Sequence, residues 1–278
     1  AMASLSLPGI DEIFTRTDPE RIEWVTLKMV ENCSAAKQSG ALAELFAMGP
    51  CDLSLAELRQ MIWLAAFHGV DHYVTAVSAL DARANIEKPG YFNPISYAQP
   101  WFEFLKELGD DSVLASEFAR KEALFQIALR YPQSLASSPS AAPESSGLDL
   151  AGLLRALVQS QWQVRLVDEE ASLDSSYKVV LALHEGGVVE ERSHSSFGDA
   201  TGLLSWLEQK LTRGVSVEGE DGRLEKSILL KSYADGSFAV LSLGDAPAGP
   251  LVLKRGSSAS IPFTLPPRGV FTSFSSAA

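Results

Sequence analysis

Apolar residues recur at helical spacing in the first half of the chain and in short β-rich runs in the second half. Between the two patterns lie residues 134–147, which are almost all Ser, Ala and Pro and carry one charged residue. Such a segment buries too little apolar surface to offset its ordering entropy, so it predicts a flexible linker. We therefore expect two domains: an all-α helical domain over residues 1–133 and an α+β domain over residues 148–278.

Helix signals follow one another through the first half. Asp18-Pro19-Glu20 is typical of a helix start, and residues 41–48 predict a short helix stopped by Gly49-Pro50. Ser54 and Glu57 have the spacing of a capping box. Further helices are predicted over residues 70–82 and from Asp110 or Asp111 to Tyr131. The expected architecture is a set of helical hairpins.

Residues 61–86 resemble a single ankyrin repeat. The resemblance rests on Leu64-Ala65-Ala66, on Gly69 three residues later, and on the ending Ala84-Asn85. It lacks the Thr-Pro-Leu-His opening and covers about a tenth of the chain. What it implies is a helix–turn–helix pair, which agrees with the helical spacing around it.

The second half alternates strand signals with two helix signals. Helices are expected over residues 148–160 and 201–211, the second capped by Asp199. Gly186-Gly187 and Ala234-Asp235-Gly236 predict hairpin turns. Prolines near the end of the chain indicate edge strands. The expected strands are 162–167, 177–184, 188–193, 224–233 and 237–243, in a mainly antiparallel sheet.

Charge and cysteine content restrict the class of protein. The chain has 23 Lys and Arg against 35 Asp and Glu, a formal net charge of −12, and no basic run. Phosphate backbones and anionic membranes require clustered cations, so we expect neither nucleic acid nor a membrane as a partner. Two cysteines are too few for a disulfide framework, and no secretory signal is visible, which favours a cytoplasmic location.

Aromatic residues concentrate around a proline-broken loop at residues 88–100. Tyr91, Phe92 and Tyr97 are the candidate partner-binding residues, because exposed aromatic side chains dominate protein interfaces. Trp101 and Phe104 share a helix face by their spacing and are expected inside. We expect a protein as the partner, and the acidic surface would suit a basic one. The oligomeric state stays open.

One pair of histidines has metal-ligand spacing. His68 and His72 lie at i and i+4, with Asp71 between them. The arrangement resembles the His-x-x-Glu-His motif of inverted-zincin metallopeptidases, with Asp71 where that family has Glu. Gly69 weakens the helix that must hold the ligands, and Cys33 and Cys51 have no zinc-module spacing. We therefore expect neither a bound metal nor a cofactor.

No nucleophile elbow or phosphate-binding glycine motif occurs in the sequence, and nothing in it favours a glycosidase pair of carboxylates. The resulting hypothesis is a non-enzymatic interaction protein, such as an adaptor, a chaperone-like factor or an inhibitor, that uses two tethered modules. The alternative is a metal-dependent hydrolase that uses His68, Asp71 and His72.

Overall fold

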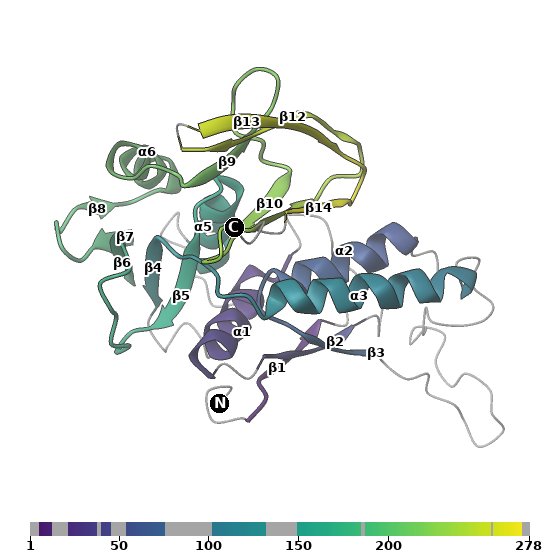
Figure 1. Cartoon of the computed structure of the whole chain (residues 1–278). Coiled ribbons are helices and arrows are strands. Elements are labelled where there is room, and N and C mark those ends of the chain that lie inside the picture. The colour runs from purple at the N-terminus through teal and green to yellow at the C-terminus, as the bar shows by residue number, and fades with distance from the viewer. Residues whose placement is uncertain are drawn as a thin grey trace.

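The computed structural model describes residues 6–12, 22–37, 40–45, 54–75, 102–131, 149–184, 187–256 and 258–273. These residues form three units in chain order, each built around β-strands (Figure 1). None of the helices in these ranges is long and apolar enough to cross a bilayer.

The first unit is a parallel three-stranded sheet with helices between its strands. The sheet order is β1-β2-β3, and both neighbouring pairs are parallel. Helices α2 and α3 lie side by side against it (Figure 1). The elements are β1 (Gly9–Glu12), α1 (Trp24–Lys37), β2 (Leu42–Leu45), α2 (Leu55–Ala66), β3 (His72–Thr75), a 3₁₀ turn (Phe102–Phe104) and α3 (Leu105–Ala119).

The prediction of an all-α first half is therefore wrong. Residues 42–45 form β2 rather than a helix, and Ala43 and Leu45 are buried in it. A parallel strand covered by helices is apolar on successive positions, so its periodicity cannot be told from that of a short buried helix. Residues 72–75 likewise form a strand, which removes the second helix of the ankyrin resemblance.

The second unit is a five-stranded mixed sheet with the order β5-β4-β6-β7-β8. Its central strand β4 (Ile127–Tyr131) runs parallel to β5 (Val164–Asp168) and β6 (Val179–His184), and β7 (Gly187–Glu190) and β8 (Ser196–Phe197) are antiparallel additions. The last predicted helix of the first half is confirmed up to Ala119, where α3 ends, and is wrong beyond it, because β4 follows. Asp110 and Asp111 lie inside α3 and do not cap it. The expectation of an α+β domain with a mainly antiparallel sheet is also wrong for this unit.

Strand β4 lies before the predicted linker at residues 134–147 in the sequence, and its two neighbours in the sheet, β5 and β6, lie after it. One sheet therefore combines chain from both sides of the predicted linker, which itself lies outside the described residues.

Several local capping and turn signals are confirmed, whereas the predicted helix start at Asp18 lies outside the described residues. The Ser54–Glu57 capping box opens α2, with both reciprocal hydrogen bonds present. The Asp199 carboxylate accepts from the Gly202 N–H at the start of α6 (Ala200–Lys210). Helix α5 (Leu150–Gln159) and the β10–β11 hairpin also lie where the sequence predicts them.

The third unit consists of two antiparallel three-stranded sheets. One has the order β13-β12-β9 and the other β10-β11-β14. Both contribute to one apolar cluster, which includes Val217, Ile228, Val240 and Leu253. Pro262 lies on β13, the edge of its sheet. The strands are β9 (Val215–Glu218), β10 (Ile228–Ser232), β11 (Phe238–Ser242), β12 (Ala248–Arg255), β13 (Ser258–Leu265) and β14 (Val270–Ser273).

A buried amide joins the second and third units. Gln161 is 2% exposed. Its Nε2 donates to the carbonyls of Val217 (2.8 Å) and Glu225 (2.9 Å), and its Oε1 accepts from the Val217 N–H at 2.8 Å. One side chain thus satisfies three backbone groups of another unit.

A buried carboxylate joins all three units. Glu31 on α1 accepts from Lys28 of the same helix at 2.8 Å and from Lys231 on β10. Lys28 also donates to the Val164 carbonyl of β5 at 3.0 Å. The three residues are 4–5% exposed. Burial raises the pKa of Glu31, but the two ammonium groups outweigh it and hold that pKa at about 2.

The Gln161 contacts generate a prediction for stability. Gln161→Ala leaves three polar backbone groups without their side-chain partner, so we expect a loss of about 2–4 kcal/mol in the free energy of unfolding. Urea denaturation measures this loss. Gln126→Ala is the control, because it removes one exposed hydrogen bond to the Thr212 carbonyl. Equal effects of the two substitutions would contradict the assignment.

The buried carboxylate generates a prediction for pH. Glu31→Gln leaves two buried ammonium groups without their counter-charge, and we expect a loss of about 3–5 kcal/mol at pH 7. The pKa of Glu31 falls on folding, so its contribution is present above pH 4.5 and is lost as the pH falls towards 2. Urea denaturation of both proteins should therefore give stabilities that converge as the pH falls through that window.

The control for this experiment is Glu208→Gln, which removes an exposed partner of Arg213 and should cost less than about 1 kcal/mol. A difference between wild type and Glu31→Gln that stays constant down to pH 2 would contradict the electrostatic role of Glu31.

Candidate functional site

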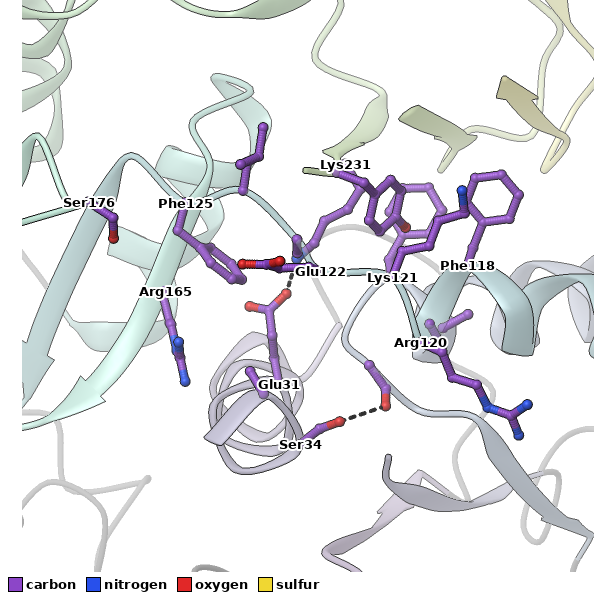
Figure 2. Close-up of a pocket in the computed structure, with 18 of the residues that line it drawn as sticks. Glu31, Ser34, Phe118, Arg120, Lys121, Glu122, Phe125, Arg165, Ser176 and Lys231 are labelled. Carbon is purple, nitrogen blue, oxygen red and sulfur yellow. Dashed lines mark hydrogen bonds and ion pairs between the residues drawn. The ribbon is translucent and has the colours of Figure 1, made fainter. Parts of the chain in front are cut away.

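A cleft of about 980 Å³ opens where the three units meet. Its walls come from the end of α1, the turn after α2, residues 118–126 between α3 and β4, the middle of β5, the loop at 174–178 and the end of β10 (Figure 2). The segments come from distant parts of the sequence, so no local motif marks this cleft. Its volume lies at the upper end of the range for small-molecule sites.

One of the residues that line the cleft, Tyr233, carries a buried hydroxyl group. Tyr233 is 2% exposed, and its Oη has no hydrogen-bond partner among the described residues. Burial raises the pKa of this phenol, so it stays protonated and is able to donate. Glu31 and Lys231, which pair with each other, line the same cleft (Figure 2). Burial lowers the pKa of Lys231 to about 8, although Glu31 opposes the shift.

Aromatic rings form part of the wall. The Lys231 ammonium lies 4.6 Å from the centroid of the Phe125 ring, and the Arg165 guanidinium lies 5.8 Å from the same centroid. The Phe118 ring packs against Tyr233 with 5.7 Å between centroids. Phe118 is fully buried and Phe125 is half-buried, so the Phe125 ring borders the cleft beside two cationic side chains.

Charges around the cleft are close to balanced. Arg120 pairs with Asp71 at 2.8 Å, and Lys121 pairs with Asp235 at 2.5 Å. Arg165 donates instead to the neutral oxygens of Asn32. The cationic lining residues are Arg120, Lys121, Arg165, Lys178 and Lys231, and the anionic ones are Glu31, Asp71, Glu122 and Asp174.

Three helices present their carboxyl ends to the cleft. Ala35 lies near the end of α1, Phe67 caps α2, and Ala119 ends α3, and all three residues line the wall. Helix carboxyl ends carry a partial negative charge from their unsatisfied carbonyls. This field offsets the small excess of cationic side chains.

The residues of the predicted metal motif are not arranged as ligands on a helix. Helix α2 ends at Ala66, so His68 lies in the following turn and His72 on β3. His68 is buried beside the Leu64 carbonyl, 2.8 Å from its Nδ1, and burial lowers its pKa to about 3. Within the described ranges, no group of three His, Cys, Asp or Glu residues could hold a metal ion.

Asp71 instead ties the entry of β3 to its surroundings. One carboxylate oxygen accepts from the Ala41 N–H at 3.0 Å and lies 2.7 Å from His72 Nδ1, and the other accepts from Arg120. Burial raises the pKa of Asp71, but these bonds outweigh it and lower that pKa. Gly40 is required here, because a Cβ at its position would collide with this carboxylate.

The other residues singled out from the sequence are mostly outside the described ranges. Cys33 lies half-buried on α1, and Cys51 is not described. The partner-binding residues Tyr91, Phe92 and Tyr97 also lie outside these ranges, as does Trp101. Phe104, which we expected inside, is 45% exposed.

A second set of residues lies at the carboxyl ends of the parallel strands. Asp11 on β1 pairs in register with Glu44 on β2, one residue before each strand ends. Ala43 and Leu45, on either side of Glu44, are buried, and Glu44 is only half-buried, so it belongs to the face opposite the core. Sequence reasoning missed this pair because it predicted no strand at either position.

The chain sequence matches no protein-family model and no curated protein. Its structure is similar to solved glycosidases. A cold-adapted β-galactosidase from a Rahnella species matches with a TM-score of 0.62 at 12% identity, over 96% of this chain and 60% of that one. A GH42 β-galactosidase from G. stearothermophilus matches with a TM-score of 0.58 at 10% identity, over 96% and 59%.

A rhamnosidase from a Novosphingobium species matches with a TM-score of 0.55 at 12% identity, over 97% of this chain and 34% of that one. The chain thus spans between about a third and three fifths of the length of these structures. At such low identity the likeness shows the fold alone. It extends over both halves of the chain, and so it agrees with the sheets in overturning the predicted all-α half.

Proposed function

We propose that this chain works as part of a carbohydrate-active protein of the glycoside hydrolase kind. The observation that carries the proposal is the structural match over 96% of the chain. Each of the three units is built from a common arrangement of strands and helices, and a match to one unit alone would carry no functional weight. The match extends over all three, and the matched structures bear the names of β-galactosidases and a rhamnosidase.

The carboxyl ends of the parallel strands supply chemistry that fits this proposal. In enzymes built from βα units, substrates bind at the carboxyl ends of the strands. Asp11 and Glu44 occupy one register position on adjacent strands, and adjacent strands lie about 4.8 Å apart. Glycosidases use carboxyl groups as the nucleophile and as the acid and base. We assign one of these roles to Glu44.

The functions predicted from the sequence gain no support from the described residues. An adaptor, chaperone-like factor or inhibitor stays a prediction, because its aromatic side chains are not described. The hypothesis of a metal-dependent hydrolase required His68 and His72 as metal ligands on one helix. His68 lies in a turn and His72 on a strand, so this helical pair does not exist. A cytoplasmic location also stays a prediction, and it rests on the sequence alone.

Turnover of nitrophenyl glycosides tests the proposed function. We expect hydrolysis of a β-galactoside or an α-rhamnoside, and a loss of about 10²–10⁴-fold in kcat/KM for Glu44→Gln, because the substitution removes the ionisable group and keeps its shape. Glu117→Gln is the matched control, an exposed glutamate on α3 away from the strand ends.

The expected pattern is full activity for the control and near-complete loss for Glu44→Gln, with unchanged thermal stability for both. Absence of hydrolysis in the wild-type protein across both glycosides would contradict the proposal. Equal turnover in the wild type and in Glu44→Gln would contradict the role of Glu44.

A further inference from the structure

We propose that Val74 determines the specificity of the site that contains Glu44, and that it selects 6-deoxyhexosides. These sugars carry a methyl group on C5 where other hexosides carry a hydroxymethyl group. The choice of a sugar as the ligand rests on the proposed function. The choice between the two kinds of hexoside rests on where β3 places Val74.

Val74 is the neighbour of Glu44 on the adjacent strand. Glu44 on β2 pairs in register with Val74 on β3, and adjacent strands lie about 4.8 Å apart. The preceding pair, Ala43 and Tyr73, belongs to the apolar core or packs against it. Successive side chains of a strand point to opposite faces, so Glu44 and Val74 both face away from that core.

Val74 is open to solvent at the edge of the sheet where the proposed substrate binds. It is 44% exposed and lies one residue before the end of β3. A single exposed apolar residue elsewhere on a surface is common and needs no explanation. Val74 differs by its place, because βα enzymes bind their substrates at the carboxyl ends of the strands. A sugar whose C1 lies at Glu44 therefore has an apolar side chain beside it.

An apolar neighbour restricts which part of the sugar lies against it. Valine has no donor or acceptor, so a hydroxyl group held against it loses its hydrogen bonds to water without replacement. The ring carbons C2, C3 and C4 of a hexopyranoside carry hydroxyl groups. Only the substituent on C5 can be entirely apolar, and its carbon, C6, is separated from C1 by just two ring atoms. A methyl group at C6 therefore covers Val74 and removes apolar surface from water.

Matched pairs of nitrophenyl glycosides test the inference. A β-D-fucoside and a β-D-galactoside differ only in the hydroxyl group on C6, and so do an α-L-rhamnoside and an α-L-mannoside. An enclosed apolar pocket rejects an added hydroxyl group by about 10²-fold. The contact with Val74 is open on one side, so we expect kcat/KM to favour the 6-deoxy member of the hydrolysed pair by about tenfold.

One variant and a matched control separate this contact from a general loss of activity. Val74→Thr keeps the shape of the side chain and adds a hydroxyl group, so the ratio of kcat/KM within the pair should fall about three- to tenfold, towards one. Val113→Thr makes the same change at a residue of α3 that is 63% exposed, and it should leave the ratio unchanged. A merely structural effect of Val74→Thr would slow both members of the pair equally.

Binding of the free sugars gives a second readout that does not require turnover. Isothermal titration calorimetry with D-fucose and D-galactose, and with L-rhamnose and L-mannose, should show the same preference for the 6-deoxy sugar. Val74→Thr should remove that preference, and Val113→Thr should keep it.

A preference for the 6-deoxy sugar that depends on Val74 supports the inference. Equal treatment of both members of each pair, or a preference that Val74→Thr leaves unchanged, overturns it. Turnover that depends on Glu44, with a ratio insensitive to Val74→Thr, overturns this inference alone. Binding that prefers the 6-deoxy sugar through Val74, without hydrolysis of any glycoside, overturns the proposed hydrolysis alone. Absence of both hydrolysis and binding overturns both proposals.

Discussion

The structure depends on one buried carboxylate shared by two lysines. The Glu31 carboxylate accepts hydrogen bonds from Lys28 on its own helix and from Lys231 on β10. Lys28 also donates to the Val164 carbonyl of β5. Removing one charge from such a set is far more costly than replacing the whole set with apolar side chains. The ionic cluster therefore constrains position more than it adds stability: the end of α1, the centre of β5 and the end of β10 must lie within reach of one another.

This constraint also creates the cleft. Glu31 and Lys231 line it, and Tyr233 follows two residues after Lys231, where the chain leaves β10. The residues that hold the units together thus bring an unpartnered phenol to the cavity between them. A core of apolar side chains alone would leave the units free to close this space, whereas paired charges require a fixed geometry.

The sequence predicts local features of this chain well and its long-range organisation poorly. Caps such as Ser54 and Asp199 and the turn at Asp235-Gly236 are determined by neighbouring residues, and the structure confirms them. Strand β2 was not predictable in the same way, because three of its four residues are apolar and so short a run does not distinguish a strand from a short buried helix.

The cleft was even harder to predict from the sequence, since Glu31 and Lys231 lie 200 residues apart. One signal was present. Lys231 directly follows the apolar run Ile228-Leu229-Leu230 in a predicted strand, and a lysine there needs a buried partner. Lys28 and Glu31 have i,i+3 spacing on the first predicted helix, but a surface ion pair explains that spacing equally well. Only the fold brings the three residues together.

A double-mutant cycle between Glu31→Gln and Lys231→Met, followed by urea denaturation at pH 7, tests this account most directly. If the Glu31–Lys231 contact joins α1 to β10, the two substitutions share one interaction, and the coupling free energy should be about 2–3 kcal/mol. Substitutions whose effects add to within about 0.5 kcal/mol would place the two side chains apart and contradict the account.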